Sequence, residues 1–139
     1  MHSHFRTRRS GLTAATALVI WAGLAHAADG PLTGAQETPP VSTSAAGVAS
    51  IAVAADKSVS GAVKTTGIDG TMAHIHLGAP NEAGPPIITL SKGENGAWNV
   101  PPGAKLSDAQ LASYKAGNLY VNVHSAAHPG GEIRAQLKP

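Results

Sequence analysis

The sequence predicts an all-β protein, an antiparallel β-sandwich with one short helix in a crossover loop. After residue 30, glycine or proline recurs about every ten residues, with short aliphatic stretches between, and several stretches alternate apolar and polar side chains. Such alternation is typical of strands that bury one face, and turn residues at this spacing favour a sandwich or barrel. The length of 139 residues allows one domain, and the absence of cysteine excludes a disulfide scaffold and cysteine catalysis.

The first 27 residues have the features of an export signal. Arginines between residues 6 and 9 precede an uncharged, largely apolar stretch over 12–24, and an Ala-His-Ala cleavage pattern follows at 25–27. We expect cleavage there and a mature chain, 28–139, that is exported to the periplasm or secreted. The apolar stretch is shorter than the roughly 20 residues that span a bilayer, so no transmembrane anchor is predicted. The arginines leave both general secretory and twin-arginine export open.

Removing that segment changes the sign of the net charge. The full chain has a formal net charge of +2, whereas residues 28–139 hold seven lysines or arginines against eight acids, with no basic run. Nucleic acids and anionic membranes are bound chiefly through clustered positive charge. We therefore expect no nucleic-acid partner.

The glycines and prolines divide the chain into seven expected strands and one expected helix. The strands are expected at residues 47–54, 58–66, 71–77, 87–91, 97–100, 118–124 and 131–137. The helix begins after Ser107, a favourable N-cap, and Gln110 completes a capping box. Gly117 is a typical stop signal, so the helix is short and lies in the loop between the fifth and sixth strands.

Four histidines follow residue 28, all within or just after two of these strands. Because successive side chains of a strand point to opposite faces, His74 and His76 share one face, about 6.6 Å apart along the strand. Their apolar neighbours mark the other face as the core. In the strand at 118–124 the same alternation places Tyr120, Asn122 and His124 on the face away from the core. In the last strand the outward residues are Glu132, Arg134 and Gln136.

These outward residues predict a metal site if their strands are neighbours. The turn before residue 132 joins the last two strands as a hairpin, which brings His124 near its charged outward residues. Neutral imidazole suits Cu(II), Zn(II) or Ni(II), and copper binds most tightly at an unconstrained nitrogen site. The predicted ligands are His74, His76 and His124, with Glu132, Arg134 and His128 in the surrounding shell. The alternative is a polar sheet face without metal, with His128 as a turn residue.

Three stretches resemble the CHRD domain, a module named from chordin and found in bacterial secreted proteins. They are 32–41 (LTGAQETPPV), 73–80 (AHIHLGAP) and 120–136, which contains YVNVHS and PGGEIRAQ. The resemblance covers nearly all of 28–139, which we therefore expect to be a single CHRD domain after a signal at 1–27. It implies an extracytoplasmic, immunoglobulin-like β-sandwich and no agreed biochemical activity.

A second resemblance is to the copper site of the copper-zinc superoxide dismutases. That family has an H-x-H strand, a later V-x-H strand end, and a glycine-rich turn before a strand with an anion-guiding arginine. The matching positions here are His74 and His76, then His124, then Gly130-Gly131 and Arg134. The bridging histidine, zinc ligands and cysteines of that family have no counterpart, so the resemblance implies at most a mononuclear three-histidine copper site on a superoxide-dismutase-like sandwich.

The sequence leaves three functions open. The first is an exported, non-catalytic binding module with copper as its cofactor. The second is a structural or interaction module that binds a protein or glycan partner and no metal. The third is a superoxide-dismutase-like redox enzyme in which Arg134 attracts a small anion.

Overall fold

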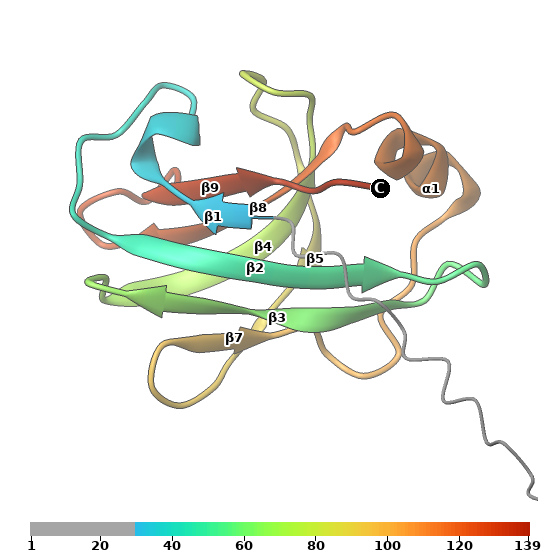
Figure 1. The fold of residues 1–139 in the computed structure, drawn as a ribbon, viewed down its shortest axis with the longest axis horizontal. Coiled ribbons are helices and arrows are strands. Elements are labelled where there is room, and N and C mark those ends of the chain that lie inside the picture. Colours follow the sequence, from blue (N-terminus) through green and yellow to red (C-terminus); the bar gives the residue numbers. More distant parts are fainter. Residues whose placement is uncertain (1–29) are drawn as a thin grey trace, which may run out of the picture.

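The computed structural model describes residues 30–139 and shows two antiparallel sheets packed face to face (Figure 1). Sheet A has the strand order β1-β2-β3-β7-β6, and sheet B has the order β5-β4-β8-β9. The prediction of an all-β sandwich with one short α-helix is confirmed. The predicted signal at 1–27 lies outside the described residues.

Six of the seven expected strands are present, and their bounds lie close to the predicted ones. Sheet A contains β1 (Gly30–Leu32), β2 (Ala46–Val53), β3 (Val59–Thr66), β6 (Ser91–Lys92) and β7 (Ala97–Asn99). Sheet B contains β4 (Gly70–Leu77), β5 (Pro86–Thr89), β8 (Leu119–Ser125) and β9 (Ile133–Gln136). The expected single strand at 87–91 is wrong, because the chain changes sheets at the buried Leu90 and forms β5 and β6 on either side of it. Sequence analysis also missed β1 and the 3₁₀ helix η1 (Gly34–Gln36).

The helix α1 (Asp108–Lys115) lies in the crossover from β7 in sheet A to β8 in sheet B. Ser107 caps it as predicted: its Oγ accepts from the Gln110 N–H at 3.1 Å, and Gln110 Oε1 accepts from the Ser107 N–H at 2.9 Å. Two first-turn donors are thereby satisfied. No helix in the described part of the chain is long and apolar enough to cross a membrane.

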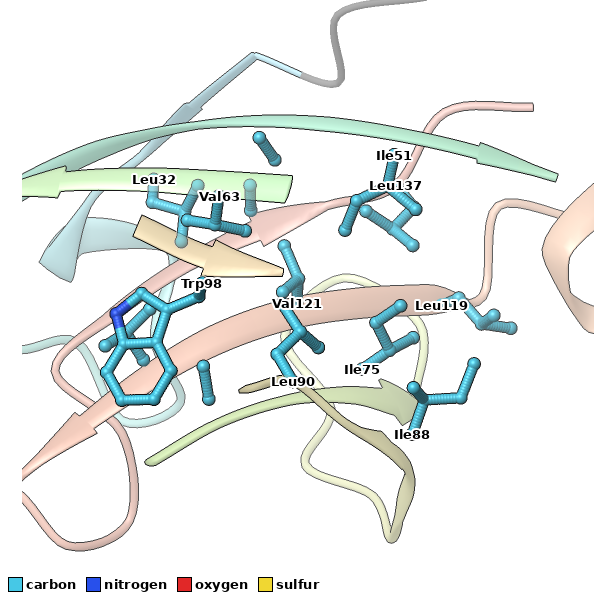
Figure 2. Close-up of a cluster of buried hydrophobic side chains, with 14 of the residues drawn as sticks. Leu32, Ile51, Val63, Ile75, Ile88, Leu90, Trp98, Leu119, Val121 and Leu137 are labelled. Carbon is cyan, nitrogen blue, oxygen red and sulfur yellow. The ribbon is translucent and has the colours of Figure 1, made fainter. Parts of the chain in front are cut away.

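The core fills the space between the two sheets (Figure 2). Leu32, Ile51 and Val63 face it from sheet A, and Ile75 and Val121 face it from sheet B; all five are at most 1% exposed. Ile75 and Val121 have the inward parity that the alternating pattern predicts for their strands. The core face of sheet B is therefore apolar, which leaves its polar residues on the other face.

β8 lies between β4 and β9, and this arrangement assembles the polar face of sheet B. Across β4 and β8, His74 is paired with Asn122, and His76 with Tyr120. Across β8 and β9, Asn122 is paired with Arg134. The histidine strands are thus direct neighbours, and the hairpin predicted between the last two strands is present.

Loops cover most of the outer face of sheet B, although Met72 on β4 stays exposed. All seven residues of β8 are buried. The cover is formed by residues 33–43, which include η1, by the loop at 78–85, and by the turn at 126–131. Figure 1 shows η1 and the loop after β4 together at the top of the view. Polar side chains of this face must therefore find partners within the protein.

Candidate metal centre

The three predicted ligands, His74, His76 and His124, converge on this covered face. One nitrogen of each ring lies within 4.8 Å of one nitrogen of each of the other two. Their ring centroids are 4.9 to 5.9 Å apart. His76 and His124 are only 7% and 6% exposed, and His74 is half-buried. Strand parity puts the first two on one face, and the pairing of β4 with β8 brings the third to them.

Backbone carbonyls determine which nitrogen of two rings faces the cluster. His76 Nδ1 lies 2.9 Å from the carbonyl oxygen of Gly84, and His124 Nδ1 lies 2.9 Å from that of Pro129. Because a carbonyl oxygen only accepts, both rings carry a proton on Nδ1, and in the neutral form each leaves a lone pair on Nε2. Metal-bound histidines are typically oriented in this way by a second hydrogen bond.

His74 completes the group through its other nitrogen. Its Nδ1 lies 3.0 Å from His124 Nε2. With neutral His124 protonated on Nδ1, the proton of this hydrogen bond belongs to His74. Two nitrogens bonded at about 2.0 Å to one metal ion lie about 3 Å apart. The spacing therefore fits a shared ion in place of the proton.

The environment keeps the rings in the form that binds metal. Burial lowers the pKa of His74, and the neighbouring His124 lowers it further. Burial also lowers the pKa of His76; the hydrogen bond to the Gly84 carbonyl and a weaker interaction with Asn122 offset part of that decrease, while His74 and His124 add to it. Both rings are therefore neutral at pH 7, and a neutral imidazole has the lone pair that a metal ion needs.

Three buried acceptor atoms in this region lack a hydrogen-bond partner: His76 Nε2, Asn122 Oδ1 and Glu37 Oε1. A buried polar atom left unpaired costs about 1 to 3 kcal/mol. A metal ion bound to the three histidines would satisfy His76 Nε2 directly. The donor set and this unused lone pair both fit a metal ion.

Glu37 is a buried acid that sequence analysis missed. Its side chain enters from the segment after η1 and hydrogen bonds Asn122. Burial raises the pKa of Glu37 to about 6, and Asn122 and Arg134 offset part of that increase. The backbone fits closely around it: a Cβ on Gly131 (φ 125°) would collide with the Asn122 amide and lie 2.5 Å from Glu37 Oε1. In the sequence, Asn122 is recognisable as an outward residue of the strand that carries His124. No local pattern marks Glu37 as a residue of the site.

Arg134 lies near the site but deep in the protein. It is 2% exposed, and its guanidinium lies 3.5 Å from the ring centroid of Tyr120. Its Nη1 donates to the carbonyl of Glu82 at 2.8 Å, and its Nη2 donates to that of Ala79 at 2.9 Å. Arg134 thus anchors the covering loop at 78–85 and does not stand open to solvent as an anion guide would.

Tyr120 connects this loop to the histidines. Its ring stacks on His76 with centroids 4.8 Å apart and planes 5° from parallel. Its hydroxyl accepts from the Gly84 N–H at 3.1 Å, beside the carbonyl that holds His76. Arg134 therefore helps to hold the His76 ring in place, both through the loop that carries Gly84 and through the Tyr120 ring.

Glu132 and His128 lie at the hairpin that carries His124. Glu132 accepts from Thr43 Oγ1 at 2.6 Å and also from Ser125, and these hydrogen bonds lower the pKa of Glu132. The His128 N–H donates to Ser125 Oγ at 3.2 Å, within the turn. Glu132 and the backbone of His128 therefore hold the hairpin in place, and their membership of a shell around a metal ion stays a prediction.

Comparison with known proteins supplies a family. The family model of the CHRD domain matches residues 28–137, which include all three converging histidines and the segments that cover them. No curated protein and no solved structure matches the chain.

Proposed function

The chain belongs to the CHRD domain family, and from this premise we propose that it is an exported, non-catalytic binding module that holds one copper ion on His74, His76 and His124. The family supports a binding module of the secreted type. The family match begins at residue 28, directly after the predicted cleavage site, and this supports export to the periplasm or the cell exterior.

The observation that carries the metal proposal is the convergence of three imidazole nitrogens within 4.8 Å. Carbonyl oxygens already orient two of the rings, so little ordering entropy remains to oppose binding. An all-imidazole site favours copper over zinc or nickel by the usual order of divalent affinities. Bound copper would supply a positive charge and a one-electron redox couple, while the protein orients the rings and limits water.

The competing functions find less support in the geometry. In an interaction module without metal, the convergence of three imidazole nitrogens within 4.8 Å would have no role. In a dismutase-like enzyme, an exposed arginine would guide the anion, yet Arg134 is buried and donates to backbone carbonyls. The non-catalytic copper module accounts for both facts.

Metal titration of the purified protein tests the proposal. Cu(II) is expected to raise the unfolding midpoint more than Zn(II) or Ni(II), because imidazole ligands bind it most tightly. Free ligand at 100 times its Kd stabilises the folded state by about 2.7 kcal/mol. The shift should disappear in His124→Ala and persist in His128→Ala, a matched control on the same hairpin. Circular dichroism without metal verifies that both variants are folded. Equal shifts in the two variants, or no shift with any metal in the parent protein, would contradict the proposal.

A further inference from the structure

The histidine cluster is not enclosed evenly. His76 and His124 are nearly inaccessible, His74 is half-buried, and Met72, two residues before His74 on β4, is 48% exposed. Met72 is paired with His124 across β4 and β8. The side of the cluster that His74 shares with Met72 is therefore its least enclosed side.

Met72 lies on the same face of β4 as His74 and opposite His124 on β8. It has the outward parity of His74, because the residue between them, Ala73, is fully buried in the core. Opposite residues on antiparallel strands have Cβ atoms about 4.5 to 5.5 Å apart. A methionine side chain has three rotatable bonds and a polarisable sulfur, so its thioether spans such a gap.

Packing does not account for Met72. It is one of two large hydrophobic side chains left exposed in the described part of the chain, the other being Val48 on sheet A. Val48 lies among exposed residues of β2, whereas Met72 borders three potential metal ligands. It is also the only methionine after residue 1.

We propose that Met72 is a fourth, thioether ligand and that the site thereby holds Cu(I) as well as Cu(II). This inference rests on the proposed copper function. Imidazole binds both oxidation states, whereas a thioether is a soft ligand that selects Cu(I). Met72 therefore strengthens Cu(I) binding, adds little to Cu(II) binding, and raises the reduction potential of the bound ion.

Separate titrations of the two oxidation states test the role of Met72. Cu(I) affinity is measured anaerobically by competition with bicinchoninate, with ascorbate as the one-electron reductant, and Cu(II) affinity by competition with a nitrogen chelator. Met72→Leu, close in volume, should weaken Cu(I) binding about tenfold or more and change Cu(II) binding less than about threefold. Val48→Leu, at the other exposed apolar site, should change neither affinity. X-ray absorption of the Cu(I) form should show a sulfur neighbour in the parent protein and none in Met72→Leu.

The outcomes separate this inference from the function on which it rests. If the parent protein binds Cu(II) but Met72→Leu leaves Cu(I) affinity and the absorption spectrum unchanged, the Met72 assignment fails and the histidine site stands. If the substitution weakens Cu(I) and Cu(II) binding equally, the selectivity is overturned. If the parent protein binds neither ion, both proposals fail. Unfolding without metal should be nearly unchanged in Met72→Leu, since the side chain is exposed.

Discussion

The two sheets share one core but differ on their outer faces. In β2 of sheet A, Ala49 and Ile51 are buried, whereas Val48 and Ser50 between and beside them are exposed. In β8 of sheet B, residues of both parities are buried because loops cover the outer face. Alternation therefore assigns a side chain to a face of the sheet, but it does not say whether that face meets water.

The difference has a chemical consequence. A polar side chain on sheet A is satisfied by water, whereas one on sheet B must be satisfied by the covering loops. The carbonyls of Gly84 and Pro129 do this for the Nδ1 atoms of His76 and His124, which leaves the Nε2 atom of each ring for the cluster. The cover thus converts a polar sheet face into an oriented ligand set.

The largest effect is expected from a substitution that forces the covering loops away from sheet B. At Gly131 an added Cβ would collide with the Asn122 amide, and its φ of 125° disfavours any side chain. We expect Gly131→Ala to lower the free energy of unfolding by about 3 kcal/mol or more. Gly130→Ala, where nothing lies within 4 Å, should change it by less than about 0.5 kcal/mol. Urea unfolding followed by circular dichroism measures both, and equal losses would contradict the packing described.

The same substitution in both sheets compares the faces directly. Asn122 on β8 is 2% exposed and bonded to Glu37, whereas Asn99 on β7 is exposed. We expect Asn122→Ala to cost about 2 kcal/mol, because it leaves a cavity and unpairs a buried acid. Asn99→Ala should cost less than about 0.5 kcal/mol. A similar cost for both in urea unfolding would show that the cover does not exclude water.

The buried acid predicts a pH dependence. The pKa of Glu37 rises from 4.5 to about 6 on folding, so the folded state holds the proton more tightly than the unfolded state. The stability that this proton provides is complete below pH 4.5 and is lost as the pH rises through about 6. Relative to the parent protein, Glu37→Gln should gain about 1 kcal/mol between pH 4.5 and 7.5, with chelator present. A stability difference that stays constant across this range in urea unfolding would refute the prediction.

The smallest effect is expected on the open face of sheet A. Val48 is 55% exposed, so its methyl groups contribute little burial. Val48→Thr keeps the β-branched shape that suits a strand and should change the free energy of unfolding by less than about 0.3 kcal/mol. A loss of 1 kcal/mol or more in urea unfolding would show that something covers this face in solution.

The sequence alone predicted most of the fold. The period-two pattern identified the main strands and the shared face of His74 and His76, and Ser107 with Gln110 marked the helix start. These features depend on neighbours a few residues apart, so they are visible in a short window. The division of the strand at Leu90 was missed, because either sheet accepts the same apolar run.

Only the tertiary structure decided what surrounds the histidines. Glu37 meets Asn122 across 85 positions of chain, and Arg134 reaches Ala79 across 55. Such contacts depend on which strands are neighbours and on how loops fold back, and no local periodicity encodes either. The sequence therefore determined which residues share a face, whereas the long-range packing of the loops buried that face and oriented the imidazoles.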